Sequence, residues 1–417
     1  MNISLFQVVL AIVFILLDIY IFQAIRTVFD SSSATVRTLV YGAYWLISGV
    51  TLVMFLLFYL LDVSATENRG LRTLIFGLIF VNYFSKFFGV AVLLIDDVTR
   101  AIRWSWSALR ASSSSPAAST RGIPRSEFLA KSALVATAIP ALGFTYGIVS
   151  GAYDYRIRRL TLALPHLPRS FDGIRIAQVS DIHSGSFFNK TAVAGGVDML
   201  LAEKPDVVFF TGDLVNDRSE EVTDYVPLFS QIRAPLGVFS TLGNHDYGDY
   251  TQWPSAKAKQ QNLQNLIEAH RQMGWNLLLD EHRFLQQGDG KLAIIGVENW
   301  GLRGFAKYGD LAKAYRGSEE ADVKLLLSHD PSHWNGQVRP MYPDIDVTFS
   351  GHTHGMQFGI ETAYFRWSPV QYVYPQWAGL YTEGQQHLYV NRGYGFIGFP
   401  GRIGILPEIT ILELTRA

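Results

Sequence analysis

Five short segments of this 417-residue sequence place aspartate, histidine or asparagine directly after an apolar run. Carboxylate, imidazole and amide groups without a thiolate suit Mn²⁺, Fe or Zn²⁺, whereas Mg²⁺ and Ca²⁺ prefer oxygen ligands alone. Together the segments offer more ligands than one ion can use, so we expect two ions with a shared ligand. The segments are Ser180-Asp181-Ile182-His183, Thr211-Gly212-Asp213, Gly243-Asn244-His245-Asp246, Ser328-His329-Asp330 and Gly351-His352-Thr353-His354.

Two neighbouring divalent ions predict a reaction class. Ions about 3.5–4 Å apart stabilise both the attacking and the leaving oxygen of a displacement at phosphorus. The residues therefore predict phosphoester hydrolysis. The chain has no cysteine, which excludes disulfides, thiolate metal sites and cysteine nucleophiles. Its net charge is -1, so no overall positive field favours nucleic acid, and we expect no nucleic-acid partner.

The polar segments require strands that end at one common edge. The apolar runs before them lie at residues 174–179, 207–210, 237–240, 323–327 and 345–349. Residues 191–204 and 260–273 show apolar side chains at helical spacing. Because α/β sheets gather functional side chains beyond the carboxyl ends of their strands, we expect an α/β catalytic domain over residues 154–417.

The first part of the chain has a different composition. Hydrophobic residues make up 49% of the sequence and charged residues 17%, and the apolar excess lies near the N-terminus. Four apolar runs, at about 5–25, 39–61, 73–95 and 128–149, are each long enough to cross a bilayer. Buried helices of a soluble domain are the alternative, as is a signal peptide for the first run. We expect an all-α transmembrane domain of four helices over residues 1–153, with a linker at 96–127.

Two further expectations concern this N-terminal part. Asp18 and Lys86 lie at similar depths in parallel spans, and because lone charges in a membrane are costly we expect them to pair. In the linker, residues 97–110 alternate arginines with tryptophans and aliphatic residues. That pattern favours either a short helix in the membrane interface or a polar loop.

The order Asp-x-His, Gly-Asp, Gly-Asn-His-Asp, His, Gly-His-x-His across Asp181–His354 resembles that of the calcineurin-like metallophosphoesterases. The flanking sequence resembles the bacterial membrane-anchored branch, which includes UDP-2,3-diacylglucosamine pyrophosphatases and twin-arginine-exported phosphodiesterases. Residues 351–357 resemble the segment Gly-His-Thr-His-Gly-Gly-Gln of that branch, with Met356 in place of a glycine. The tail segments 391–393 and 407–410 are also similar. The resemblance covers about residues 150–417 and implies a sandwich of two mixed β-sheets flanked by helices.

The resemblance also implies roles for the motif residues. One metal would be held by Asp181, His183, Asp213 and His354, and the other by Asp213, Asn244, His329 and His352, so that Asp213 bridges. A hydroxide between the metals would attack phosphorus. His245 would serve the leaving group as proton donor or charge stabiliser, with Asp246 orienting its ring, although Asp246 could instead cap the following turn.

Substrate contacts are less defined in the sequence. Arg218 and Arg392 could each grip a phosphate through two hydrogen bonds, or each could form a surface salt bridge. Seven aromatic residues crowd into Tyr364–Tyr381. They would either contact lipid beside the site, as tyrosine and tryptophan favour membrane interfaces, or cover an edge of the core.

These observations predict a membrane-anchored phosphohydrolase with two divalent metals, Mn²⁺ first and Fe or Zn²⁺ as alternatives, that cleaves a phosphoester or pyrophosphate bond. Because the spans hold the domain near the bilayer, we expect membrane lipid as a partner and a lipid-linked substrate, with a soluble nucleotide or small phosphodiester as the alternative. A non-enzymatic scaffold or sensor is the other class.

The arginines after spans one and three slightly outnumber those on the opposite side. Residues 125–131 resemble a twin-arginine signal whose second arginine is serine. Both favour a bacterial inner-membrane protein with its catalytic domain outside the cytoplasm.

Overall fold

The computed structural model describes residues 5–60, 69–110 and 127–417 and separates into two units, a helical unit at 1–146 and a catalytic unit at 147–417. The sequence placed the boundary at residue 153, a few residues later. The serine-rich part of the expected linker, residues 111–120, lies outside the described residues, as do Arg125 and Ser126 of the export-like stretch.

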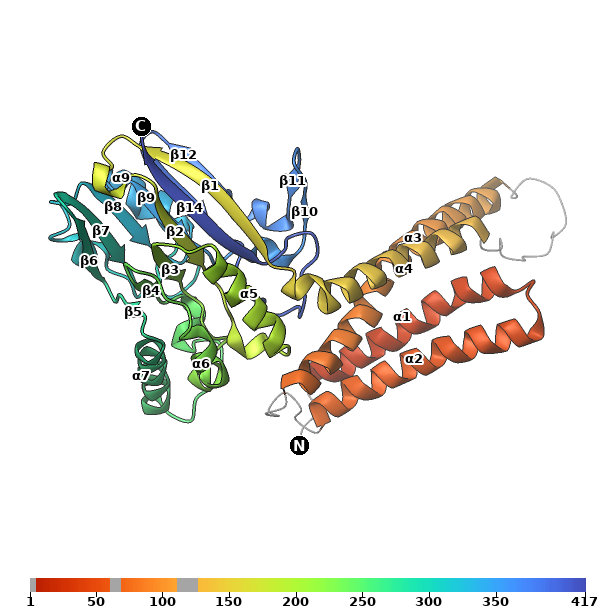
Figure 1. The fold of residues 1–417 in the computed structure, drawn as a ribbon. Coiled ribbons are helices and arrows are strands. Elements are labelled where there is room, and N and C mark those ends of the chain that lie inside the picture. The colour runs from red at the N-terminus through yellow and green to blue at the C-terminus, as the bar shows by residue number, and fades with distance from the viewer. Residues whose placement is uncertain (1–4, 61–68, 111–126) are drawn as a thin grey trace. The chain divides into compact units, whose positions relative to one another are not determined.

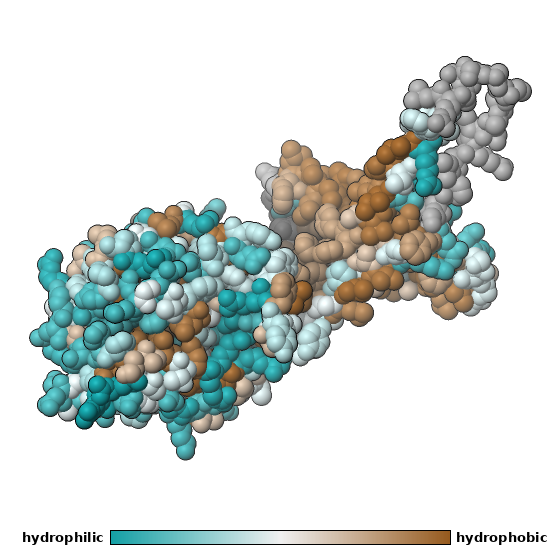
Figure 2. Space-filling view, turned by 90° about the horizontal axis from the view of Figure 1, so that it is seen from above, coloured by the Kyte–Doolittle hydropathy of each residue, from teal (hydrophilic) through white to brown (hydrophobic). Residues whose placement is uncertain are grey.

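Four long helices make up the N-terminal part of the chain (Figure 1). All four are long and apolar enough to cross a membrane by length and composition. In Figure 2 the surface of the helical unit is largely hydrophobic, whereas that of the catalytic unit is largely hydrophilic. The helices are α1 (Leu5–Phe29), α2 (Ala34–Leu60), α3 (Arg69–Arg110) and α4 (Glu127–Val149).

Helix α3 is longer than the sequence analysis predicted. It has 42 residues and continues through residues 96–110, which were assigned to the linker as a separate interfacial helix or a loop. No glycine or proline interrupts the chain between Gly89 and Arg110, so nothing in the sequence ends the helix after the apolar run. The expected break before residue 97 is therefore wrong.

The predicted ion pair inside the helical unit is confirmed. Lys86 of α3 pairs with Asp18 of α1, and both side chains are buried. Ser48 of α2 donates to the Asp18 carboxylate at 2.8 Å and accepts from the Lys86 ammonium at 3.0 Å. The hydroxyl of Tyr44 donates to the Asp18 backbone carbonyl at 2.8 Å. The three helices thus share one buried polar cluster, which we call the Asp18–Lys86 cluster.

The catalytic unit contains two six-stranded mixed sheets, as the resemblance implied. In both sheets, parallel and antiparallel pairs occur side by side. The first sheet consists, in spatial order, of β1 (Arg156–Leu164), β14 (Glu408–Arg416), β2 (Ile174–Val179), β3 (Val207–Thr211), β4 (Val238–Thr241) and β5 (Asn276–Leu277). The second consists of β12 (Gly379–Glu383), β13 (Gln386–Val390), β9 (Val347–Ser350), β8 (Val323–Leu327), β7 (Gly290–Gly296) and β6 (Glu281–Gln287).

The central strands are buried on both faces, which explains their continuous apolar runs. In β3, Phe209 packs between the two sheets against Phe349 of β9, whereas Phe210 faces the helices on the other side. Helices α5 (Lys190–Ala202) and α7 (Ala256–Met273) cover the first sheet, close to the helical spacing found at 191–204 and 260–273. Helix α8 (Leu311–Tyr315) packs on the second sheet.

A small hairpin stands outside both sheets. Strands β10 (Ile360–Glu361) and β11 (Arg366–Trp367) pair only with each other among the described strands, and Figure 1 shows them projecting from the catalytic unit. The hairpin follows directly on the loop after β9, which contains the Gly-His-Thr-His segment.

Candidate metal centre

The predicted ligands lie in the loops directly after five strands, three from the first sheet and two from the second. Gln178 of β2 joins the two sheets at this end by donating to the Thr211 hydroxyl and to the Ser350 carbonyl, both at 3.0 Å. The carboxyl ends of β2, β3, β4, β8 and β9 therefore meet at one edge of the sandwich, as the sequence analysis expected. The ligands that follow them are Asp181, His183, Asp213, Asn244, His329, His352 and His354.

The backbone at these ligands is unusual. Asp181, His183, Asp213, His352 and His354 all have positive φ angles, between 48° and 69°. Residues other than glycine rarely adopt this left-handed conformation, and where they do so in a group they commonly mark a functional site. Hydrogen bonds hold the loops in place: the His352 backbone amide, for example, donates to the Asp181 carboxylate at 2.9 and 3.0 Å.

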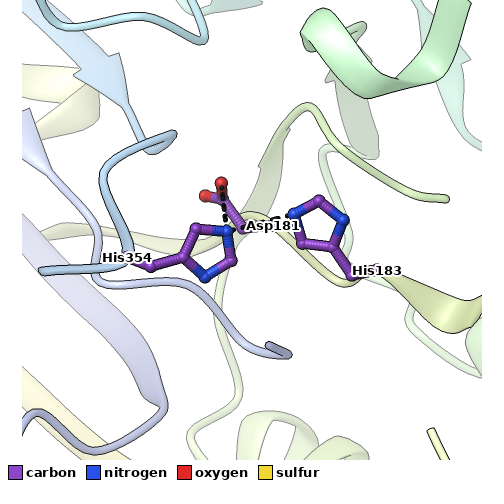
Figure 3. Close-up of side chains that lie close together, drawn as sticks. All are labelled: Asp181, His183 and His354. Atoms are coloured by element: carbon purple, nitrogen blue, oxygen red, sulfur yellow. Dashed lines mark hydrogen bonds and ion pairs between the residues drawn. The ribbon is translucent and has the colours of Figure 1, made fainter. Parts of the chain in front are cut away.

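Asp181, His183 and His354 form the first ligand cluster (Figure 3). The Nε2 atoms of the two histidines face each other at 3.0 Å, and His354 Nε2 lies 3.2 Å from an Asp181 carboxylate oxygen. All three side chains are buried. His354 Nε2 thus faces an imidazole nitrogen and a carboxylate oxygen, and a cation placed among the three groups would bind all of them. The donor set fits a divalent metal ion.

Asp213, His329 and His352 form the second cluster, with Asn244 beside them. Asp213 Oδ2 lies 3.1 Å from His329 Nε2, and His352 Nδ1 lies 2.8 Å from Asn244 Oδ1. The other ring nitrogen of His329 is 2.7 Å from the Thr211 carbonyl, which fixes the ring with Nε2 toward Asp213. Asp213 Oδ2 is also 3.5 Å from His183 Nε2, so this carboxylate touches both clusters.

The charges of the centre match the forms in which these groups bind metals. Burial alone would raise the pKa values of Asp181 and Asp213, but the neighbouring histidines hold both below the ordinary range. Burial lowers the pKa values of His183 and His352, which keeps them neutral. His329 differs: burial would lower its pKa, yet the Asp213 carboxylate raises it to about 10. A proton there compensates the two carboxylates, and a bound cation would displace it.

His245 lies beside the first cluster, with its ring centroid 5.0 Å from that of His183. Its backbone amide donates to Asp213 at 2.9 Å. The sequence analysis assigned the orientation of its ring to Asp246, but the structure gives the ring a different partner. Nδ1 of His245 lies 2.7 Å from the Asn216 backbone carbonyl. The Nδ1 proton is therefore committed to Asn216, which leaves Nε2 free.

Asp246 instead holds the backbone of the ligand loops. Its carboxylate accepts hydrogen bonds from the amides of Asp213 at 2.9 Å, Leu214 at 2.8 Å and Gly243 at 2.8 Å. The side chain is fully buried. Asp246 therefore caps backbone amides, as the alternative interpretation proposed. It caps the turn at residues 244–247 through Gly243 and also the loop after β3 through Asp213 and Leu214.

The two arginines proposed for substrate have other partners. Arg392 is 2% exposed and forms a buried ion pair with Glu408 and a second contact with Glu361 at 2.7 Å. The salt-bridge alternative therefore applies to Arg392, but in the core and not on the surface. Arg218 is exposed, packs its guanidinium 4.5 Å from the Trp253 ring and donates to the Gln252 carbonyl at 3.2 Å.

The sequence analysis missed a loop at the edge of the second cluster, residues 301–309. The Phe305 ring is 4.7 Å from the His352 ring, and the Arg303 guanidinium is 5.6 Å from the Tyr374 ring. The Tyr374 hydroxyl is in turn 2.9 Å from His352 Nε2. Arg303 is exposed and lies seven residues beyond the end of β7, so the pattern of polar residues directly after a strand could not find it.

A buried arginine behind the first cluster was also missed. Arg402 is 0% exposed, and its guanidinium lies 3.2 Å from His354 Nδ1. It also donates to the backbone carbonyls of Arg392 at 2.8 Å and Gly395 at 2.9 Å. This single side chain ties the tail of the chain to a predicted ligand.

Comparisons with known proteins agree with this geometry. Residues 1–152 match a family model described as a probable calcineurin-like phosphoesterase transmembrane domain, and residues 174–356 match the calcineurin-like phosphoesterase model. The "Transmembrane protein with metallophosphoesterase domain" of Danio rerio is 29% identical over 68% of this chain and 62% of its own length. The chain therefore spans less than two thirds of that relative.

Two bacterial relatives are covered more completely. The "Uncharacterized metallophosphoesterase YkuE" of Bacillus subtilis is 29% identical over 60% of this chain and 81% of its own length. The "UDP-2,3-diacylglucosamine pyrophosphatase LpxG" of Chlamydia trachomatis is 27% identical over 58% of this chain and 83% of its own length.

Proposed function

We propose that this chain, which belongs to the calcineurin-like metallophosphoesterases and carries a four-helix membrane domain, uses two divalent metals to hydrolyse a phosphoester or pyrophosphate bond of a lipid-linked substrate. One observation carries the proposal. Asp213 Oδ2 lies 3.5 Å from His183 Nε2 in the first cluster and 3.1 Å from His329 Nε2 in the second. A carboxylate so placed can be shared by two ions.

The two clusters supply three ligands each, and the resemblance adds Asp213 to the first and Asn244 to the second. Asp181, His183, Asp213 and His354 would hold one ion, and Asp213, Asn244, His329 and His352 would hold the other. We assign Mn²⁺ first, with Fe or Zn²⁺ as alternatives, because nitrogen and oxygen donors are mixed and no thiolate is present. When bound, such ions act as Lewis acids toward the attacking and leaving oxygens at phosphorus.

The protein's own proton donor in this proposal is His245. The Asn216 carbonyl holds the Nδ1 proton at 2.7 Å, so donation uses the imidazolium form, in which Nε2 carries the second proton and gives it to the leaving oxygen. Asp246 is a positioning residue, because its carboxylate holds the amide of Asp213 in the loop after β3 and the amide of Gly243 in the loop that carries His245. Arg303 takes the role first considered for Arg218 and Arg392, because it is an exposed cation next to Tyr374 and the second cluster.

Two observations support a lipid-linked substrate. Four helices capable of spanning a membrane precede the catalytic unit on the same chain. One relative bears the name of a pyrophosphatase that acts on a diacylated sugar nucleotide. A membrane location for the active domain brings it to substrates that are themselves confined to the bilayer.

We further propose that the protein resides in a bacterial inner membrane with the catalytic unit outside the cytoplasm, from the arginine distribution around the spans. Fusions after Ala417 test the side. An active alkaline phosphatase fusion supports an external catalytic unit, whereas a fluorescent GFP fusion with an inactive phosphatase contradicts it.

The test of activity uses purified full-length protein in lipid nanodiscs with added Mn²⁺. Substrates are a bis-nitrophenyl phosphodiester, a nitrophenyl monoester, a diacylated sugar nucleotide and phospholipids, with the Asp213→Asn variant as control. We expect Mn²⁺-dependent hydrolysis that the variant lacks, fastest on a lipid-linked substrate. Turnover of soluble esters alone supports the soluble-substrate alternative. Two bound metals without any turnover would favour a scaffold.

A further inference from the structure

We infer that a cluster of exposed apolar side chains beside the metal centre inserts into the bilayer that α4 enters. We call this surface the lip. It comprises the β10–β11 hairpin and the segment after it, with side chains Phe358, Ile360, Tyr364, Phe365, Tyr372 and Val373. The inference rests on the membrane domain and not on the hydrolysis reaction, although it would explain how a lipid-linked phosphate reaches the metals.

The exposure of the lip divides the aromatic segment predicted from the sequence. Tyr364 is 100% exposed, Tyr372 77% and Phe365 55%, whereas Tyr374 and Trp377 are 7% and 3% exposed and belong to a small core. The core-edge alternative therefore accounts for only the second half of the segment. Large aromatic and aliphatic side chains gathered on one exposed surface mark an interaction site, and their types suit a membrane interface.

The hairpin of the lip is held together and fixed to the rest of the catalytic unit. Ile360 of β10 is paired with Trp367 of β11, and the Trp367 ring centroid lies 6.4 Å from that of Phe358. Glu361, the residue of β10 next to the turn, accepts from Arg158 at 2.6 Å and from Arg392 at 2.7 Å. These ion pairs fix the hairpin to the rest of the catalytic unit just before its turn, and Tyr364 and Phe365 lie in that turn, at the projecting end in Figure 1.

Backbone contacts link the lip to the end of the membrane helix. Helix α4 has 23 residues, so at about 1.5 Å per residue its length is close to the hydrocarbon thickness of a bilayer, and its last turn lies at the membrane boundary. Gly147 in that turn accepts a hydrogen bond from the Arg402 amide at 3.1 Å. Ile403, which follows Arg402, donates its backbone amide to the Gln357 carbonyl at 2.7 Å and accepts from the Gly359 amide at 2.9 Å. It also forms a β-bridge with Phe358.

These contacts lie within the catalytic unit, and residues 402 and 403 join the root of the lip to Gly147 in the last turn of α4. The occupant of the lip is therefore the lipid surface of that same bilayer. A separate protein partner is not needed to explain the exposed side chains, since α4, which can span a membrane, is covalently continuous with the domain.

Met356 connects the lip to the ligands. It lies two residues beyond His354 and has a φ of 56°, in the left-handed region where the similar family segment has glycine. Its side chain is 57% exposed. In this conformation a non-glycine residue costs about 1 kcal/mol, so the backbone here would be more stable with glycine than with methionine. Its exposed side chain adds an apolar residue to the segment between His354 and the lip.

Because the chain has no cysteine, single cysteines can report the depth of the lip directly. Full-length Phe365→Cys carries an environment-sensitive fluorophore in vesicles of phosphatidylcholine and phosphatidylglycerol at 3:1. The control is Asp289→Cys, in the exposed turn between β6 and β7. Quenching is measured with nitroxide-labelled lipid and with iodide present on both faces of the vesicles.

We expect lipid nitroxide to reduce emission of the Phe365→Cys label at least about twofold, with little effect of iodide, and the reverse for the Asp289→Cys label. If iodide quenches both labels equally and the nitroxide lipid neither, the lip does not enter the bilayer and the inference is wrong. The readout does not require any enzyme activity, so a failure of the proposed function does not affect it.

A second variant tests what the lip does for substrate. Combined Ile360→Ser, Tyr364→Ser and Phe365→Ser should lower hydrolysis of vesicle-embedded substrate about tenfold and leave a water-soluble phosphodiester unchanged. Met341→Ser, at a 62% exposed position elsewhere in the unit, is the matched control and should change neither rate. Equal rates on embedded substrate for the triple variant and the control would overturn this role.

Discussion

The helical unit and the catalytic unit each bury a cluster of charged groups, and the two clusters are built differently. In the Asp18–Lys86 cluster an ammonium faces a carboxylate and Ser48 hydrogen-bonds to both. In the metal centre Asp181 and Asp213 face histidine nitrogens, two of which lie 3.0 Å apart. The first cluster matches each acceptor with a donor. The second gathers carboxylates and imidazoles, the groups that bind divalent metals. Buried charge alone therefore does not identify a functional site, whereas the types of the groups that surround it do.

The backbones of the two clusters differ in the same sense. Asp18, Ser48 and Lys86 lie inside regular helices. The metal centre places five ligands in the left-handed region, where the conformational cost has to be offset by the surrounding loops. The Asp18–Lys86 cluster stabilises the packing of three helices. In the metal centre, the loops hold the predicted ligands in place although their backbone conformation is unfavourable.

The largest expected effect removes the shared acceptor. Asp213→Asn should abolish hydrolysis and lower metal content below two equivalents, because an amide cannot supply negative charge to two ions. Elemental analysis and turnover of the full-length protein measure this. Asp289→Asn, at an exposed turn, is the control and should behave as wild type. Two bound equivalents with full activity in Asp213→Asn would refute the shared-ligand assignment.

The next effect concerns a residue beside the cluster that does not bind metal. His245→Ala should keep both metals and lose about 10²–10⁴-fold in turnover if Nε2 donates the proton. The loss should shrink for nitrophenol esters, whose leaving group needs no proton. His282→Ala, on β6, is the control. An equal loss on good and poor leaving groups would argue against proton donation.

The sequence predicted those parts of both clusters that depend on local pattern. Ligands such as Asp181 and His329 follow apolar runs, and the carboxyl ends of such strands meet at one edge. Asp18 and Lys86 could be paired from their depth along two spans. The continuation of helix α3 past residue 96 has a local signal too, since no glycine or proline lies between Gly89 and Arg110, although the change in composition there favours an end.

What the sequence could not predict depends on contacts between distant loops. Arg392 lost its assigned role because Glu361 and Glu408 meet it in the core. Asp246 binds backbone amides of the β3 loop, and Arg303 reaches the centre through Tyr374. None of these contacts has a fixed sequence spacing or a periodicity, so no pattern could indicate them.

The helical cluster should respond to mutation as a matched pair. Asp18→Asn or Lys86→Met alone should lower the free energy of unfolding by about 3 kcal/mol, because each leaves a buried charge without its partner. The double variant should lose less than the sum of the two losses. Thermal unfolding of the full chain in detergent gives the cycle, and metal content should stay at two equivalents throughout. Strictly additive losses would mean that the two charges do not stabilise each other.

A smaller effect is expected at the edge of the metal centre. Arg303→Ala should raise KM about tenfold with little change in kcat, because in our proposal this exposed cation would contact substrate phosphate without holding a metal. Arg218→Ala is the matched control, since that arginine packs on Trp253 and is expected to leave KM unchanged. A larger KM change in Arg218→Ala than in Arg303→Ala would reverse the assignment.

The smallest effect separates backbone strain from surface function. At Met356, with its φ of 56°, Met356→Gly should raise the free energy of unfolding by about 1 kcal/mol, since glycine adopts this conformation without strain. Turnover of a water-soluble phosphodiester should not change, because the side chain is 57% exposed and is not among the ligands. Turnover of a vesicle-embedded substrate should fall about twofold as the lip loses one apolar side chain. Met356→Ala separates the two contributions: it removes most of the apolar surface but keeps the strain, so it should lower the embedded rate without the gain in stability. If Met356→Gly is less stable than wild type, the methionine side chain packs against its surroundings strongly enough to outweigh the strain, and its place in the exposed lip would have to be abandoned.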